Sequence, residues 1–350
     1  METTVKKQNY FIPIIVMILL FGMISFVTNL ASPMGDILKN QFKIPNWQGT
    51  LGVFANFIAY AVMGIPSGNL LQKKGYKKTA LIAVIVGFIG VGIQTLSGVF
   101  GSFAVYLLGA FVAGFSMCLL NTVVNPMLNR LGGGGNKGNQ LIQIGGSFNS
   151  LCGTAVIIIT GLLIPSIVDA KISDVFPLMY TALGIFAFAF IVILLTKIPE
   201  NEQKQDAAKQ VEKGKGPMAF RHFVLGAIAI FIYVGVEVGI PNVLNKWLQN
   251  PELNVLGSGV NAEAVAGSVA ATYWFLMLIG RLIGGIIGSK VSAKAMLTTV
   301  SAIGIILTLL AMFGPSTMVK FPAFNGAHGF GMESIPMNAA FLVCIGLAPQ

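Results

Sequence analysis

The chain has 350 residues, of which 55% are hydrophobic, 10% are charged and 42 are glycine, and its net charge is +10. A soluble domain carries about a quarter charged residues, so this composition excludes an ordinary soluble protein and indicates an integral membrane protein. The basic residues lie in short loops between apolar runs, so we attribute the positive charge to membrane orientation and not to nucleic-acid binding.

The apolar runs have the length that membrane-spanning helices need, and they lack the alternation of a β-barrel. They therefore predict an all-α membrane protein. A further apolar piece at 337–347 is too short to cross a bilayer as a helix, so we expect the chain to end within its tenth span. The predicted spans are residues 11–38, 51–71, 79–96, 103–131, 140–164, 175–196, 220–248, 266–287 and 295–313.

The segment 198–219 interrupts this pattern with polar residues of both charges, and it cannot bury enough apolar surface to fold alone. We interpret it as a cytoplasmic linker. It separates a six-helix N-terminal bundle (1–197) from an incomplete C-terminal bundle (220–350). By the positive-inside rule, the lysine-rich loops, the linker and the amino terminus are expected in the cytoplasm.

Cofactor and metal motifs are weak. Cys118, Cys152 and Cys344 lie inside apolar runs without the spacing of metal ligands, and the two histidines stand apart from any cluster. The glycine-rich segment 132–138 lacks the Lys and Ser/Thr of a phosphate loop and lies between two spans, so we expect a flexible loop there. We therefore predict no cofactor, no metal and no enzymatic site.

A short motif recurs after the second and the eighth span, and this repeat supports the division into two halves. It resembles the cytoplasmic loop signature of the major facilitator superfamily, which implies gating contacts between helix ends. Gln72 stands where that signature has an acid, and two lysine-rich loops placed by topology alone remain the alternative. The gating-loop candidates are Gly68, Lys73, Gly75, Lys77, Lys78, Lys290 and Lys294.

Two acids lie well inside predicted spans, Asp36 in the first and Glu237 in the seventh. A charge at the bilayer centre costs about 2.5 to 3.5 kcal/mol on insertion scales, so such residues usually line a pathway or relay protons. Proton coupling is the hypothesis for Asp36, although it could simply mark the helix end beside Lys39. Glu237, between Gly235 and Gly239, is either a packed polar anchor or a functional carboxylate.

Uncharged amides form the second polar set. Asn121 and Asn125 recur one helical turn apart in the fourth span, and Gln143 and Asn149 lie in the fifth. Amides both donate and accept hydrogen bonds, which suits the hydroxyls of a neutral sugar. Hydrogen bonds that only hold helices together are the alternative.

Five segments together resemble the fucose:proton symporter family of the major facilitator superfamily. They are SPMGDIL, GIPSGNLLQKKGYKK, LNTVVNPMLNRLG, QLIQIGGSFNS and YVGVEVGIPN. The resemblance implies twelve helices in two six-helix bundles and a central sugar site reached alternately from each side. It also implies that Asp36 couples protons and that Asn149 contacts sugar.

Three positions depart from the pattern of that family. Asn121 replaces a glutamate, Gly146 replaces a glutamine, and Pro33 replaces an asparagine. The resemblance therefore implies a monosaccharide other than fucose, with Glu237 as a substitute for the missing second carboxylate.

The sequence as a whole predicts a proton-coupled hexose transporter of the bacterial inner membrane, working by alternating access as a monomer. Its partners are a small neutral sugar, protons and membrane lipid. Asn121, Asn125, Gln143 and Asn149 are its predicted sugar ligands, and Asp36 and Glu237 its proton-coupling carboxylates. A membrane sensor that binds sugar without moving it, and a truncated inactive transporter, are the alternatives.

Overall fold

The computed structural model describes residues 10–164, 170–199, 220–257, 260–288, 290–326 and 329–348. Among them, eight helices are long and apolar enough to cross a membrane. The all-α membrane fold is therefore confirmed. Most of the predicted linker, residues 200–219, lies outside the described residues.

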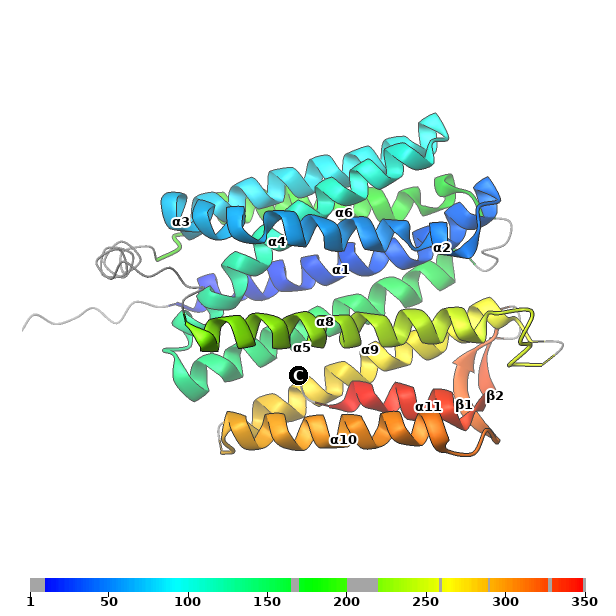
Figure 1. Ribbon diagram of the computed structural model, residues 1–350. Coiled ribbons are helices and arrows are strands. Elements are labelled where there is room, and N and C mark those ends of the chain that lie inside the picture. Colours follow the sequence, from blue (N-terminus) through cyan, green and yellow to red (C-terminus); the bar gives the residue numbers. More distant parts are fainter. Residues whose placement is uncertain are drawn as a thin grey trace, which may run out of the picture.

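The described helices form two groups, which we call the first and the second helix group (Figure 1). The first group comprises α1 (Phe11–Phe42), α2 (Asn46–Gly49), α3 (Leu51–Phe100), α4 (Phe103–Leu131), α5 (Gly135–Leu163), the 3-10 turn η1 (Ile172–Val175) and α6 (Phe176–Leu195). The second comprises α8 (Arg221–Leu248), α9 (Ala262–Ile287), α10 (Ala293–Phe313), strands β1 (Met318–Phe324) and β2 (Phe330–Pro336), α11 (Met337–Cys344) and the 3-10 turn η4 (Ile345–Leu347).

Helix α3 contains two of the predicted spans, joined at Gly75. This residue has φ 80° and ψ 173°, a conformation that is not helical and that only glycine adopts easily. The chain folds back there, so the two arms of α3 run side by side (Figure 1). The sequence predicted the lysine-rich turn between these spans, and the backbone explains why a glycine stands in it.

Local sequence signals explain several of the other helix ends. Gly101 ends α3 in the left-handed conformation at φ 59°. The side chain of Asn261 accepts a hydrogen bond from the backbone of Ala264 and so caps the start of α9. Ser292 caps the start of α10 in the same way. These caps start α9 four residues, and α10 two residues, before the predicted spans.

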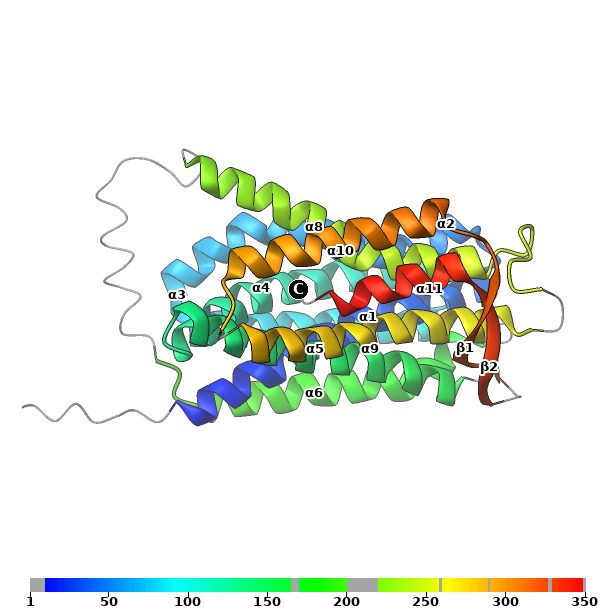
Figure 2. The ribbon, with the colours of Figure 1, turned by 90° about the horizontal axis from the view of Figure 1, so that it is seen from below.

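The two ends of the helix bundle differ in charge. One end, which we call the basic end, holds the start of α1, the turn at Gly75, the α4–α5 turn, the start of α8 and the α9–α10 turn (Figure 1). These are the segments in which the sequence placed its lysine-rich loops. The β1–β2 hairpin lies at the other end, which we call the hairpin end (Figures 1 and 2).

The core of the first group consists of buried apolar side chains from α1, both arms of α3, α4 and α6, including Met17, Leu120 and Phe186. Close helix approach depends on small residues. A Cβ on Gly87 would lie 2.2 Å from the ring of Phe186, and one on Gly90 would lie 2.5 Å from the backbone of Ala113 on α4. Glycine is therefore needed where α3 meets its neighbours.

The β1–β2 hairpin was not predicted. Its strands pair antiparallel from Met318 opposite Pro336 to Phe324 opposite Phe330. Buried Ala323 and Ile335 pack with side chains of α8, α9 and α11, so the hairpin belongs to the core of the second group at its hairpin end. A two-stranded hairpin is marginal alone, and this packing on helices accounts for its stability.

Candidate functional site

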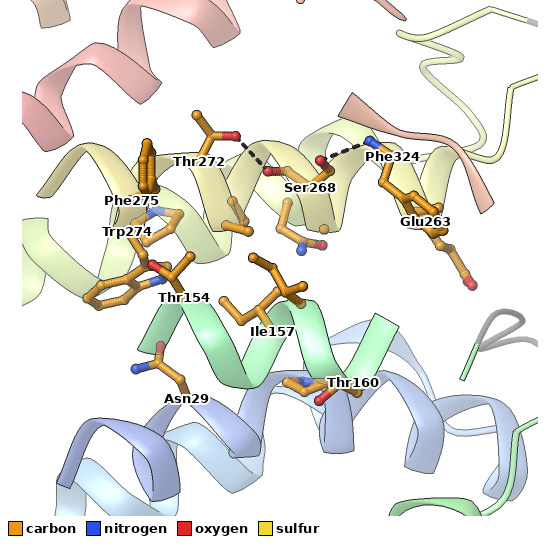
Figure 3. A pocket seen from close by; sticks show the side chains of 18 of the residues that line it. Asn29, Thr154, Ile157, Thr160, Glu263, Ser268, Thr272, Trp274, Phe275 and Phe324 are labelled. Carbon is orange, nitrogen blue, oxygen red and sulfur yellow. Dashed lines mark hydrogen bonds between the residues drawn. The ribbon is translucent and has the colours of Figure 1, made fainter. Parts of the chain in front are cut away.

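A cavity of about 590 Å³ lies between α1 and α5 of the first group and α8 and α9 of the second. Asn29 enters it from α1, Thr154 and Thr160 from α5, and Trp274 and Phe275 from α9 (Figure 3). The cavity combines amide and hydroxyl groups with aromatic rings. This mixture of apolar walls with a few polar groups is typical of small-molecule sites.

The cavity extends to the hairpin end. Its lining includes Leu162, which is 67% exposed, and Phe330 of β2, which is 73% exposed. The hairpin is held beside it by the backbone N–H of Phe324, which donates to Ser268 Oγ at 3.0 Å (Figure 3). Asn325 Oδ1 also accepts from the backbone N–H of Asn261 at 3.0 Å. The hairpin therefore forms part of the cavity rim.

Helix α8 contributes a row of amides to the same cavity. Asn242, Asn245 and Gln249 all line it. Their spacing of three and four residues places them on one face of the helix. The sequence contains this pattern, but we did not predict it, because the three residues lie at the end of a span, where amides are common.

An ion pair lies next to the cavity, on the side that faces the basic end. Arg281 Nη2 of α9 contacts Glu237 Oε1 of α8 at 2.8 Å, and both side chains are nearly buried, with exposed fractions of 10% and 13%. Arg281 Nη1 donates to the carbonyl oxygen of Gly146 at 3.0 Å and to Ser150 Oγ at 2.8 Å, both on α5. Tyr233 of α8 lies close to both members of the pair.

This geometry shows what Glu237 binds in this structure, while its role in proton coupling stays a prediction. Glu237 is a packed anchor in this structure, because its carboxylate binds Arg281. Arg281 lies where α5, α8 and α9 meet, and its contacts could not be predicted from the sequence, because its partners are distant in the chain.

The predicted amides have protein partners. Asn121 Nδ2 donates to the hydroxyl of Tyr60 at 2.9 Å, and Asn125 Nδ2 donates to Asn121 Oδ1 at 3.4 Å. Asn149 Nδ2 donates to the backbone carbonyl of Phe21 on α1 at 2.7 Å. Among the described residues that line the cavity, none of the four predicted amides is found. Gln143 faces α9, because its Cβ lies 3.5 Å from the position a Cβ on Gly285 would take.

Asp36 lies in α1, three residues beyond Pro33, which lines the cavity. The side chain of Asp36 is outside the described part of the structure. Its role in proton coupling therefore stays a prediction.

The gating-loop candidates lie at or near the turn at Gly75 and the α9–α10 turn, at the basic end. Lys77 Nζ donates to the backbone oxygens of Leu194 at 2.7 Å and Thr196 at 2.9 Å. A lysine at these last carbonyls of α6 is favoured by the helix dipole. These two bonds join α3 to α6 within the first group. A role of these bonds in gating stays a prediction.

The described residues contain no group of three or more metal-ligating side chains. Nor do they hold a disulfide, since Cys118, Cys152 and Cys344 are free thiols.

Comparison with known proteins gives consistent matches along almost the whole chain. Residues 14–346 match the family described as Major Facilitator Superfamily. The chain is 29% identical to a glucose/galactose transporter of Brucella abortus over 98% of this chain and 86% of that protein. It is 22% identical to the L-fucose-proton symporter of Escherichia coli over 96% of this chain and 78% of that protein.

Solved structures support the same fold. The crystal structure of the transporter FucP in the outward conformation superposes with a TM-score of 0.69 at 18% identity, and covers 98% of this chain and 83% of that chain. The proton:xylose symporter XylE with bound 6-bromo-6-deoxy-D-glucose superposes with a TM-score of 0.65 at 15% identity, over 97% of this chain and 78% of that chain.

Proposed function

Because the chain belongs to the Major Facilitator Superfamily, we propose that it is a proton-coupled hexose transporter that works by alternating access. The observation that carries the proposal is the cavity between the two helix groups. It reaches the surface at the hairpin end, and α5 contacts α9 on the side of the cavity that faces the basic end. A site that is open to one end and closed to the other is what one state of an alternating carrier requires.

The lining of the cavity supports a sugar as the substrate. Asn29, Asn242 and Asn245 supply amides, and Trp274 supplies a ring against which the apolar face of a sugar can pack. The names of the relatives, a glucose/galactose transporter and a fucose-proton symporter, support the same class. No catalytic function is proposed, because relatives and cavity both fit binding and movement.

The predicted amides have a place in this proposal. Asn121, Asn125, Gln143 and Asn149 would bind sugar once their present partners separate during the transport cycle. The two helix groups would correspond to the two bundles of the superfamily fold. By the positive-inside rule the basic end, with the amino terminus, would face the cytoplasm of a bacterial inner membrane.

Asp36 is the carboxyl that we propose for proton coupling, because it lies on the helix that carries Asn29 and Pro33 into the cavity. Glu237 is the second candidate. It would have to leave Arg281 before it could take up a proton. The relay therefore depends first on Asp36.

Transport is tested with the purified chain in lipid vesicles. Vesicles loaded with unlabelled glucose or galactose should take up labelled sugar by counterflow. If the sugar binds but no counterflow occurs, the chain is a sensor and the proposal is wrong.

Proton coupling is tested in the same vesicles with the variant Asp36→Asn. We expect sugar-driven proton entry to disappear while exchange of sugar persists. Glu252→Gln changes a carboxyl in an exposed turn and is the matched control. Full proton entry in Asp36→Asn would rule out Asp36 as the coupling residue.

A further inference from the structure

Arg281 makes hydrogen bonds to both helix groups. Its guanidinium binds Glu237 of α8 at 2.8 Å, within its own group. It also binds the Gly146 carbonyl and the Ser150 hydroxyl of α5, in the other group, at 3.0 and 2.8 Å. Ser150 is fully buried, so these bonds are shielded from water.

This contact lies next to the cavity, on the side that faces the basic end. On α5, Ser150 is one turn from Thr154, which lines the cavity, and Thr154 Oγ1 donates to the Ser150 carbonyl at 3.0 Å. On α8, Glu237 is one turn from Pro241, which also lines it. The guanidinium of Arg281 therefore lies between the cavity and the basic end.

A second contact lies closer to the basic end. Gln140 Nε2 of α5 donates to the carbonyl of Gly285 on α9 at 3.1 Å. Gln140 contributes one hydrogen bond from a neutral amide, whereas Arg281 contributes two from a charged guanidinium. We therefore assign the larger share of the closed contact to Arg281.

Gly146 provides the space for the guanidinium. A Cβ on Gly146 would lie 3.2 Å from Arg281 Cδ and 3.5 Å from Nε. The first distance is tighter than an ordinary contact, so a side chain at this position would require Arg281 to shift by a few tenths of an ångström. Gly146 and Arg281 thus belong to one contact between α5 and α9.

The charges explain how such a contact can open. An isolated guanidinium at membrane depth is costly. When α5 moves away, however, Arg281 keeps Glu237, so the pair remains neutral within the second group. Only the two hydrogen bonds to α5 have to break, and water entering from the basic end can replace them.

We propose that Arg281 is a positioning residue. Its hydrogen bonds to the Gly146 carbonyl and the Ser150 hydroxyl, which we call the latch, hold α5 against α9 between the cavity and the basic end. The latch therefore favours the state that is closed at the basic end. Glu237 neutralises Arg281 and orients it toward α5. The proposal rests on the alternating-access function proposed above, but its test does not require transport.

The first test measures distances between spin labels in the full chain, in a variant without the native cysteines. One label pair, at positions 137 and 294, spans the two groups at the basic end, and a second, at 171 and 253, spans them at the hairpin end. Ser150→Ala should increase the ratio of basic-end-open to closed chains about tenfold, the equivalent of ~1.4 kcal/mol. The 137–294 distance should lengthen as the 171–253 distance shortens.

The matched control is Ser147→Ala. Ser147 is on the same helix and also buried, but its hydroxyl donates to the Gln143 carbonyl of its own helix. Its distances should equal those of the parent chain. Equal shifts in both serine variants, or none in Ser150→Ala, would overturn the proposal.

A double variant that exchanges the two charges distinguishes the contact of Arg281 with α5 from its ion pair within the second group. The double variant Glu237→Arg/Arg281→Glu retains an ion pair between α8 and α9 but places a carboxylate beside the Gly146 carbonyl. We expect it to fold and to open at the basic end, whereas closed-state distances like those of the parent would refute the role of Arg281. Gly146→Ala provides a milder test and should shift the distances in the same direction.

These outcomes are distinct from failure of the transport function. If counterflow is absent but Ser150→Ala opens the basic end, the role of Arg281 is supported and the proposed transport function is wrong. If counterflow is present and the spin-label distances are unchanged in Ser150→Ala, the transport function is supported and the proposed role of Arg281 is wrong.

Discussion

Removing one charge of the Glu237–Arg281 pair should destabilise the protein strongly. The nitrogen–oxygen distance is 2.8 Å and the side chains are only 10% and 13% exposed. In Glu237→Met, Arg281 would keep its hydrogen bonds to α5 but lose its counter-charge. Breaking a buried pair in this way typically costs about 3 to 5 kcal/mol, because an uncompensated charge remains. We expect a loss of that size, and a similar one for Arg281→Met.

The double variant Glu237→Met/Arg281→Met should behave differently. It removes both charges and replaces them with apolar side chains of comparable length. Exchanging a whole buried pair for apolar residues is often neutral or stabilising. Ser150 can then bond a backbone carbonyl of its own helix, as serine does in helices. We expect the double variant to lie within about 1 kcal/mol of the parent chain.

The assay is equilibrium unfolding in mixed detergent micelles, followed by the loss of helical circular dichroism. The four chains of the cycle give a coupling energy, which should be at least about 5 kcal/mol, because the two single losses of about 3 to 5 kcal/mol each are absent from the double variant. Glu252→Met, in an exposed turn, is the control and should change stability little. If the two single effects add to within about 0.5 kcal/mol of the double, the residues do not form a pair and the described packing of α8 on α9 is wrong.

Three further predictions follow from the fold and the cavity. Gly75→Val should cost about 1 to 3 kcal/mol in the same unfolding assay, because only glycine adopts φ 80°, ψ 173° without strain, and an unchanged midpoint would contradict this turn. Lys77→Met removes two hydrogen bonds to the end of α6 and should cost about 1 to 2 kcal/mol, whereas exposed Lys78→Met should be neutral, so equal effects would refute the bonds. Trp274→Ala should raise the sugar concentration for half-maximal counterflow about tenfold, whereas Phe231→Ala on the outer surface should not, and unchanged affinity would remove Trp274 from the site.

Much of the fold could be predicted from the sequence, because membrane spans are local features. A helix that crosses a bilayer needs a long apolar run whatever its neighbours are, so the predicted span 103–131 coincides with α4, and 220–248 differs from α8 by one residue. The lysine-rich loops could be assigned to one end by counting crossings. The hairpin was missed although Asn325-Gly326 after its first strand is a known hairpin-turn signal, because its strands depend on packing against the second helix group.

The candidate site was predicted less well, since it depends on pairs that are distant in the chain. The sequence by itself determined that intramembrane acids and amides exist and on which spans they lie, because helical periodicity is local. Only the tertiary structure decided that Arg281 binds Glu237, 44 residues away, and Ser150, 131 residues away. The physical reason is that a charge inside an apolar bundle must find its partner across helix interfaces. Those interfaces are set by packing of the whole chain and not by any one span.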